Sequence, residues 1–493
     1  MKLFPSLTRL AAIAAASIVA AACSGSGGFS YSIAYDISFQ SEDHYICAEM
    51  TYIPENLDRE DVRFSLPVWA PGYYVIVDYP KYLTDFAACD SSGKPLSWRK
   101  SGKNVWIVET ADTVKVSYRI YADAWSIAES RVQGDIAFIA PNGVFMYADG
   151  DKDHPVDITV RLPEQWTRIS TALPRDGEGV FHAPDFDVLY DSPMLIGNHY
   201  SRTYTHEGHD YEFALETPEG FEDTPMAEDF FKFVSQCSLI FGDVPYDSYH
   251  LLLMREGRGG LEHQASQACY TAGKWDFATR EEYLEELRFF CHEYFHNYNV
   301  KAIRPIELGP FDYDREVFTP MLWVSEGFTC YYESLLLVRA GVQTMEEHLD
   351  YLSGFIRDLE TSEGQKHMSL RQSSYDIWLN FFNTAANGRD VRISYYVKGP
   401  VMGLVFDAVI RSMTCDERCL DDLMRLLYDR YYKEKGRGFT EGEFWTAAEE
   451  VAGGVLEDLR LYVDTTRELD YNAILEPVGI TLDSNGWVLR AIE

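Results

Sequence analysis

Short segments in which apolar and polar residues alternate run through the N-terminal part of the chain. Two examples are Tyr31–Phe39 and Val114–Tyr121, and Gly, Pro, Asp and Asn residues separate such segments from Phe29 to about Arg202. Alternation with a period of two is typical of half-buried β-strands, because successive side chains point to opposite faces of a sheet. The pattern therefore predicts an all-β domain over residues 29–205.

The pattern changes twice further along the chain. Residues 206–340 mix strand-like segments with a helix, whose start is indicated by the capping box T-x-x-E at Thr279–Glu282. From Thr344 onward capped helices predominate, and Thr344 and Thr440 each stand three residues before a glutamate. We therefore expect an α+β multidomain protein, in which the all-β domain is followed by a mixed domain, an α-helical domain and a short C-terminal tail, over residues 206–340, 341–470 and 471–493.

The first residues have the pattern of an export signal. Lys2 and Arg9 precede the apolar, alanine-rich stretch Leu10–Ala22. This stretch has the length of a signal-peptide core and is too short to span a membrane. Residues 1–22 are therefore predicted to be a signal peptide, and the protein is expected to work outside the cytoplasm.

The residues around Cys23 indicate a lipid anchor. Ala20-Ala21-Ala22-Cys23 resembles a bacterial lipobox, with alanine in place of the more usual leucine at its first position. The Ser/Gly-rich tract that follows has the composition of a flexible tether. We therefore predict that lipidated Cys23 attaches the protein to a membrane of the bacterial cell envelope through a tether over residues 23–28. Simple secretion after cleavage nearby is the alternative.

The net charge and the cysteine content argue against nucleic-acid binding and against a disulfide-rich fold. The chain of 493 residues carries a formal net charge of −35, so the phosphates of nucleic acids would repel it. The cysteines beyond Cys23 are scattered and do not resemble a disulfide framework. Cys415 and Cys419 are close in sequence, but they could pair only if the backbone between them is not helical.

The stretch His292-Glu293-Tyr294-Phe295-His296 carries the most specific chemistry. A helix is expected here because apolar residues recur with near-helical spacing after the capping box, at Tyr283, Leu284, Leu287, Phe290, Cys291, Tyr294 and Phe295. Histidines four apart on a helix have Cβ atoms about 5–6 Å apart, so both imidazoles can reach one metal ion. Glu293 can then take a proton from water bound to that metal. The motif alone leaves two ordinary histidines on a partly buried helix as the alternative.

Glu326 is the candidate third ligand. It interrupts an apolar, helix-like run that starts at Leu322 and continues through Tyr331 and Leu335. A carboxylate is costly to bury in such a run unless it is paired or bound to a metal. Two histidines and one glutamate leave a fourth position open for water, which is the arrangement of catalytic rather than structural zinc. An ion pair with a nearby Arg or Lys is the alternative for Glu326.

Several segments resemble one enzyme family. HEYFHNYNVKAIRP (292–305), LWVSEGFTCYYE (322–333) and GGLEH (259–263) are similar to segments of the glycyl aminopeptidase family of zinc metallopeptidases. These enzymes are gluzincins, whose catalytic domain is thermolysin-like. The resemblance covers nearly the whole chain after the predicted tether, because it extends to LPVWAPGYYVIVDY (66–79), VSYRIYA (116–122) and the region from SLRQSSYDIW to SYYVKG (369–399).

The resemblance implies a fold and an activity. It implies that residues 206–340 form a thermolysin-like zinc catalytic domain, and that one Zn²⁺ ion per chain binds His292, His296 and Glu326, with Glu293 as general base. The implied reaction removes N-terminal residues, small ones such as glycine and alanine, from peptides with a free N-terminus. Many family members continue into a PDZ domain. About twenty residues after Asp470 are too few for one, so no complete PDZ domain is expected.

The resemblance also assigns residues that bind the substrate. Gly259, Gly260 and Glu262 fall in a segment that forms an edge strand along the substrate in related aminopeptidases, where the glutamate receives the free α-amine. A fixed carboxylate one residue's length from the zinc would select N-terminal residues. Taken alone, Glu262 would be interpreted as a solvated loop residue.

A second catalytic residue is implied by the Y-x-K-G pattern. This pattern falls on Tyr396 in Tyr395-Tyr396-Val397-Lys398-Gly399, and it matches the tyrosine that donates a hydrogen bond to the oxyanion in related enzymes. Tyr395 is the competing assignment, and packing is the alternative role for either residue.

One position departs from the family pattern. Cys330 lies one helical turn after Glu326, where relatives are expected to have a small polar or acidic residue that can orient a zinc-bound histidine. A neutral thiol cannot do this well, so Cys330, like Cys291, is interpreted as a small buried residue or an adventitious metal ligand. The leading hypothesis is a zinc aminopeptidase, and the alternatives are a zinc endopeptidase of the same fold or a non-catalytic peptide-binding lipoprotein.

Overall fold

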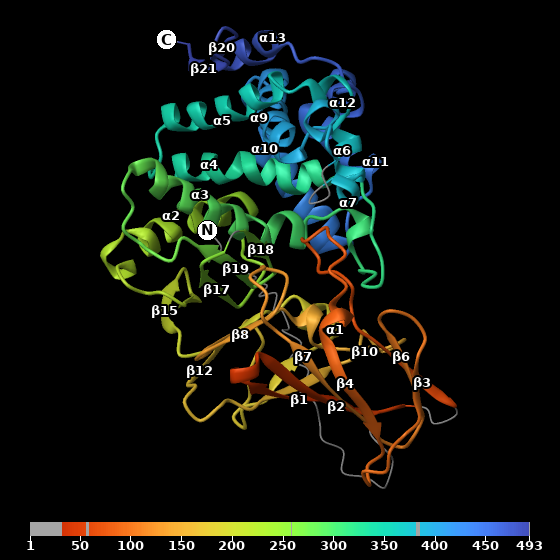
Figure 1. Ribbon diagram of the computed structural model, residues 1–493. Helices are drawn as coiled ribbons and strands as arrows, with labels where there is room; N and C mark the ends of the chain where they lie inside the picture. Colours follow the sequence, from red (N-terminus) through yellow and green to blue (C-terminus); the bar gives the residue numbers. More distant parts are fainter. Residues whose placement is uncertain (1–31, 56–58, 258, 381–384, 493) are drawn as a thin grey trace, which may run out of the picture.

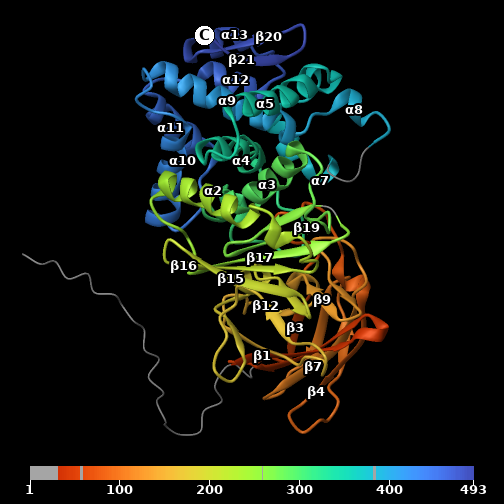
Figure 2. The same cartoon turned by 90° about the vertical axis from the view of Figure 1, so that its left-hand side faces the viewer.

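The computed structural model describes residues 32–55, 59–257, 259–380 and 385–492 (Figure 1). The predicted signal peptide, the lipidated Cys23 and the tether lie outside the described residues. A β-rich part occupies one end of the molecule and a helical part the other, and a five-stranded sheet lies between them (Figures 1 and 2).

The N-terminal part is built of β-sheets, as the alternating pattern predicts. Strand β1 (Ser32–Gln40) buries every second side chain along most of its length, including Ile33, Tyr35 and Ile37. The sheet orders are β13-β11-β1-β2-β7-β4, β10-β3-β6-β5 and β12-β14-β9-β8. The other elements of this part are β2 (Tyr45–Ile53), β3 (Asp61–Ser65), β4 (Leu83–Cys89), β5 (Trp98–Lys100), β6 (Val105–Glu109), β7 (Val114–Tyr121), β8 (Arg131–Gln133), β9 (Ile136–Ile139), β10 (Tyr147–Ala148), β11 (Val156–Val160), β12 (Arg168–Ser170), β13 (Phe181–Ala183), α1 (Phe186–Tyr190) and β14 (Met194–Gly197).

The next sheet positions the candidate site. Its order is β15-β16-β17-β19-β18, in which β16, β17 and β19 are parallel and the two edge strands are antiparallel to their neighbours. The bounds are β15 (Tyr200–His206), β16 (His209–Leu215), β17 (Ser248–Arg255), β18 (Gly260–Glu262) and β19 (Ser266–Thr271). Because β15 begins at Tyr200, this sheet starts before the boundary drawn at position 206. The strand expected from Tyr249 to Met254 is the core of β17.

Helix α3 (Arg280–Phe295) carries the first four residues of the HEYFH motif, His296 is its C-terminal cap, and the helix packs on β18 and β19. Thr279 caps it by accepting a hydrogen bond from the backbone N–H of Glu282. The Glu282 carboxylate accepts from the N–H of Ala278 rather than that of Thr279, so the reciprocal bond of the capping box is shifted by one residue. After α3 the chain makes an irregular turn, Asn297–Ala302, in which Asn299 has non-helical dihedral angles.

One apolar core joins the sheet, the motif helix and the C-terminal helices, from Tyr211 to Leu489, and Tyr74 of the N-terminal part also belongs to it. Full capping boxes are present at Thr344 and Thr440, as predicted. The predicted tail forms α13 and the hairpin β20–β21, which packs on α5. The helices and remaining strands are α2 (Met226–Phe241), α4 (Phe328–Arg339), α5 (Met345–Glu360), α6 (Leu370–Tyr375), α7 (Ile377–Asn380), α8 (Gly388–Val391), α9 (Tyr395–Met413), α10 (Leu420–Leu427), α11 (Glu441–Ala452), α12 (Glu457–Asp464), α13 (Tyr471–Leu475), β20 (Ile480–Asp483) and β21 (Val488–Ala491).

Two local features of the helical part concern an apolar stretch and a pair of cysteines. The stretch Gly388–Met413 is apolar enough to span a membrane, but 78% of its most apolar window is buried inside the protein, so it behaves as a core helix. Cys415 and Cys419 lie as free thiols in the turn between α9 and α10. Cys415 has a positive φ of 52°, so the backbone between the two is not a continuous helix.

Candidate active site

The candidate catalytic residues line one cleft of about 560 Å³ between the β-rich N-terminal part and the helices. Its walls come from α3, from the edge strand β18, from the turn before α4, from the start of α9 and from two loops of the N-terminal part. The lining residues are Gly72, Tyr73, Trp125, Ser126, Ile127, Glu256, Gly257, Gly259, Gly260, Glu262, His292, Glu293, His296, Glu326 and Tyr396. Every predicted site residue is among them.

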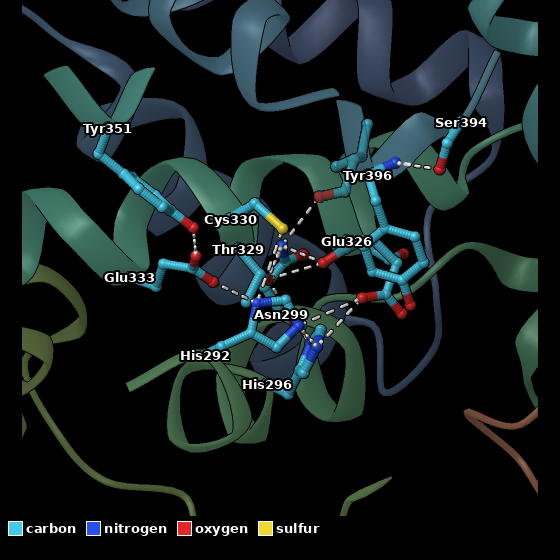
Figure 3. Close-up of polar contacts among 12 residues, drawn as sticks. His292, His296, Asn299, Glu326, Thr329, Cys330, Glu333, Tyr351, Ser394 and Tyr396 are labelled. Atoms are coloured by element: carbon cyan, nitrogen blue, oxygen red, sulfur yellow. Dashed lines mark hydrogen bonds and ion pairs between the residues drawn. The ribbon is translucent and has the colours of Figure 1, made fainter. Parts of the chain in front are cut away.

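Three side chains converge in the manner expected of a metal site (Figure 3). The Nε2 atoms of His292 and His296 lie 2.9 Å apart, and Oε2 of Glu326 lies 3.5 Å and 3.2 Å from them. Donors that share a tetrahedral Zn²⁺ at about 2.0–2.1 Å are separated by roughly 3.3 Å. The three separations therefore fit one small cation.

The environment of Glu326 supports the same fit. Its side chain is 3% exposed, and Oε2 accepts no hydrogen bond from any residue of the described ranges. Burial alone would raise the pKa of this carboxyl, but His296 and His292 beside it hold that pKa well below its usual value. A buried carboxylate costs much free energy unless it is paired or bound to a cation. A metal ion bound by this carboxylate and the two neutral imidazoles would satisfy it. The alternative pairing with Arg or Lys is not observed among the described residues.

Glu333 is a site residue that the sequence reasoning missed. Its Oε2 lies 2.6 Å from Nδ1 of His292, and its Oε1 accepts a hydrogen bond from the hydroxyl of Tyr351 (Figure 3). With Nε2 of His292 turned toward Glu326, Nδ1 carries the proton and donates it to Glu333. A carboxylate in this place fixes the tautomer and orientation of a metal-binding histidine and raises its basicity.

Cys330 occupies the position where an orienting residue was expected, but it contributes less to the orientation of His292 than Glu333 does. Its Sγ lies 3.7 Å from Nδ1 of His292, and burial raises the pKa of the thiol to about 12. The thiol is therefore neutral, as the sequence reasoning held. Glu333, one helical turn further along α4, supplies the orienting carboxylate that was expected at position 330. Cys291 is fully buried in the apolar core.

His296 is oriented by the backbone. Its Nδ1 donates to the carbonyl oxygen of Asn299, 2.7 Å away. The Asn299 side chain donates to the carbonyl oxygens of Val324 and Ser325, which directly precede Glu326. The irregular turn after α3 thus ties the histidine segment to the segment that carries the third ligand.

Glu293 is placed to move protons. It is 5% exposed, and burial, partly offset by the two imidazoles, raises the pKa of its carboxyl to about 7. A general base works best when its pKa is near the working pH. Gly260 of β18 lies against this carboxylate, because a β-carbon at position 260 would collide with Oε1 of Glu293.

Glu262 is buried in β18 rather than solvated in a loop. Its exposed fraction is 5%, and its carboxylate lies within 4.8 Å of ligand atoms of both Glu293 and His296. Gly72 of the N-terminal part covers it: a β-carbon at this position would lie 2.7 Å from Oε1 of Glu262. Gly72 has φ of +87°, which glycine adopts without strain. This contact between two distant parts of the chain was not predicted.

Tyr396 and Tyr395 differ in what they face. Tyr396 lines the cleft, while Tyr395 is 1% exposed and its hydroxyl has no hydrogen-bond partner among the described residues. Burial, followed by the charge of Glu326, raises the pKa of Tyr396 well above its usual value, so its hydroxyl stays protonated and can donate.

The glycine of the Y-x-K-G pattern has a packing role. Gly399 lies against Gly327, the residue after Glu326, so closely that a β-carbon on either one would overlap the other. Helix α9 therefore crosses the third-ligand segment at close range, and this crossing brings Tyr396 to the cleft.

Comparison with known proteins agrees with this site. Residues 34–198 match the peptidase M61 N-terminal domain, and residues 285–402 match the M61 glycyl aminopeptidase domain. The fold and the domain matches together define a peptidase. The chain belongs to the M61 glycyl aminopeptidase family, which confirms the resemblance described above. No curated protein was found to match the chain.

Solved structures show the same architecture. An aminopeptidase N family protein from Idiomarina loihiensis has a TM-score of 0.84 and 26% identity, over 92% of this chain and 79% of that chain. Legionella pneumophila aminopeptidase A, in complex with aspartic acid, has a TM-score of 0.54 and 13% identity, over 88% and 49%. A mutant M1 zinc metallopeptidase from Deinococcus radiodurans, bound to a Tyr-Ser-Ala substrate, has a TM-score of 0.53 and 13% identity, over 89% and 94%. The last two show the fold alone.

Proposed function

We propose that the protein is a zinc-dependent aminopeptidase that removes single residues, small ones such as glycine and alanine, from the amino terminus of peptides. The observation that carries this proposal is the convergence of two groups in one cleft. The candidate ligands His292, His296 and Glu326 meet there, and the buried carboxylates of Glu293 and Glu262 stand beside them.

The residues have separate roles in this reaction. His292, His296 and Glu326 would hold the zinc, which supplies Lewis-acid polarisation of the scissile carbonyl and of the attacking water. Glu293 accepts a proton from that water and passes it to the leaving amine. Tyr396 donates a hydrogen bond to the carbonyl oxygen as negative charge develops on it. Glu333 holds His292 in the tautomer that presents Nε2 to the cation.

Glu262 favours an aminopeptidase over an endopeptidase. It is a buried carboxylate on an edge strand, with no charged partner of the described ranges within ion-pair distance. An ammonium group supplies the charge that such a site needs. Gly72 backs Glu262 from the N-terminal part, so a peptide that continued past this carboxylate would meet the backbone of the 70–73 loop.

The proposal is tested with matched peptides. We expect the purified protein to release the first residue of Ala-Ala-Phe-Ala, to lose this activity with a chelator and to regain it with Zn²⁺. The same peptide with an acetylated amino terminus should be cleaved about 10- to 100-fold more slowly, since the charge-assisted contact to Glu262 is lost. Preferential internal cleavage of the acetylated peptide would instead establish the endopeptidase alternative.

We further propose that the mature protein is lipid-anchored through Cys23 in the bacterial cell envelope. The apolar stretch Leu10–Ala22 and the residues up to Cys23 support this proposal. Wild-type protein should partition with detergent, and a Cys23→Ala variant should not enter the detergent phase. Equal partition of the two would overturn the anchor.

A further inference from the structure

An exposed tryptophan stands in the cleft without a role in the chemistry described so far. Trp125 lies in the loop between β7 and β8 of the N-terminal part, and 40% of its surface is exposed. It lines the same cleft as the candidate metal ligands. A large aromatic side chain that remains exposed inside a binding cleft offers apolar area to a ligand at little entropic cost.

Arg131 packs against one face of the indole ring of Trp125. The guanidinium of Arg131 lies 4.2 Å from the ring centroid. Arg131 in turn donates two hydrogen bonds, of 2.7 and 2.8 Å, to the carboxylate of Glu216 in the loop after β16. The side chains of this ion pair are only 1% and 4% exposed. Trp125 therefore rests on a buried support that spans the N-terminal part and the central sheet.

The edge strand β18 indicates in which direction a bound peptide would run through the cleft. A peptide that pairs with this edge strand and places its amine at Glu262 has its first peptide bond beside Gly260, where Glu293 lies. Its later residues, each advancing about 3.3 Å, then pass Gly259 and Gly257. Gly259 and Gly257 precede Gly260 along the chain, on the side away from Glu262, and Trp125 and Ser126 line the same cleft. Glu216, which holds Arg131 against Trp125, also accepts a hydrogen bond from the backbone N–H of Arg255, two residues before Gly257.

We propose that Trp125 forms a binding site for an aromatic or other apolar side chain of the leaving peptide, on the carboxyl side of the scissile bond. The proposal rests on the aminopeptidase function and adds a preference on the leaving side, independent of the residue that is removed. Trp125 contacts substrate and selects it, whereas Arg131 acts through Trp125 as a positioning residue.

The test compares Ala-Phe-Phe-Ala with Ala-Gly-Gly-Ala in one protein preparation. For the wild type, kcat/KM should favour the phenylalanine peptide. In Trp125→Ala this ratio should fall about fivefold to tenfold, the usual worth of an aromatic contact, while Trp125→Phe should keep most of it. Trp98→Ala is the matched control, because Trp98 is 44% exposed on β5, packs on Phe86 and does not line the cleft.

Binding gives a readout that does not depend on turnover. In a Glu293→Gln background, calorimetric titration with the same two peptides should show the same fall in relative affinity when Trp125→Ala is added. If the ratio of affinities is unchanged, the site does not involve Trp125 and the proposal is overturned. If the wild type hydrolyses neither peptide but the affinity ratio still falls with Trp125→Ala, the binding site stands and the aminopeptidase function fails. Melting temperatures of all variants show whether a fall reflects unfolding.

Discussion

Oε2 of Glu333 lies 2.6 Å from Nδ1 of His292, on the edge of the imidazole opposite the nitrogen that faces Glu326. Tyr351 in turn donates to the other oxygen of this carboxylate. The chain from Tyr351 through Glu333 to His292 connects helix α5, helix α4 and the motif helix. One candidate metal ligand is therefore oriented by two helices that do not themselves carry the HEYFH motif.

Removing the Glu333 carboxylate should weaken metal binding. In Glu333→Ala we expect zinc affinity to fall about 10- to 100-fold, the usual effect of losing the partner that orients a metal-bound histidine. Competition with a chromophoric chelator measures the dissociation constant directly. Cys330→Ser is the matched control, since the thiol lies 3.7 Å from the same nitrogen and should contribute little. A larger loss in Cys330→Ser than in Glu333→Ala would assign the orienting role to the cysteine.

Changing the proposed general base, Glu293, should separate chemistry from metal binding. Glu293→Gln retains the shape of the side chain but cannot accept the proton, so kcat should fall about 10²- to 10⁴-fold. Zinc content, measured by elemental analysis, should be unchanged because Glu293 is not a ligand in this arrangement. Equal hydrolysis by the two proteins would show that another group is the base.

Filling the space beside Glu262 should damage amine recognition. Gly72→Ala places a β-carbon 2.7 Å from Oε1 of Glu262, so the carboxylate must move. We expect kcat/KM for free peptides to fall roughly tenfold or more, as expected for a weakened charge-assisted hydrogen bond. Gly93→Ala carries a similar backbone strain, with φ of +82°, but meets no atom within 4 Å. Similar activity losses in both variants would attribute the effect to strain rather than to the contact.

Glu286 should make the stability of the protein depend on pH. Burial raises the pKa of this carboxyl from 4.5 to about 7, and its Oε1 has no hydrogen-bond partner among the described residues. The folded state therefore binds a proton that the unfolded state has lost between these values, and stability falls as the pH rises through this window. Glu286→Gln removes this dependence and should stabilise the protein by up to about 3 kcal/mol at pH 8 but little at pH 4.

The measurement is the melting temperature of the wild type and Glu286→Gln at several pH values from 4 to 8. The difference between the two should grow as the pH rises from 4.5 to 7. Glu285→Gln, at the exposed neighbouring position, is the control and should follow the wild type. A constant difference across the whole range would indicate that the glutamine acts through packing rather than through the lost charge.

The parts of the site that were predicted are those that local spacing determines. Two histidines four apart on one helix must approach each other, and an isolated glutamate in an apolar run needs a cation. Glu333 was not predicted because the family pattern places the orienting residue one turn after Glu326, at position 330. Cys330 does stand near Nδ1 of His292 there, but the longer glutamate side chain one turn later reaches the nitrogen more closely.

The parts that were not predicted depend on how distant segments dock. Gly72 and Trp125 belong to loops of the N-terminal part, and nothing in their own sequence indicates which face of the central sheet they cover. The central sheet begins with β15 at Tyr200, before the domain boundary predicted at residue 206, for a related reason. The alternating pattern of β15 would be the same if the strand paired with the N-terminal sheets or with β16. Only the observed hydrogen bonds to β16 assign β15 to the central sheet.

Because Gly72 contacts Glu262, the cleft is complete only when the N-terminal part has docked onto the rest of the molecule. Every candidate metal ligand and the base lie between His292 and Glu326, so a chain that lacked a docked N-terminal part could still assemble a hydrolytic centre. It would lack the backbone at Gly72, which lies against Glu262, the carboxylate proposed to bind the amine. Under the proposed function, restriction to chain ends is therefore acquired only when both halves of the molecule have folded onto each other.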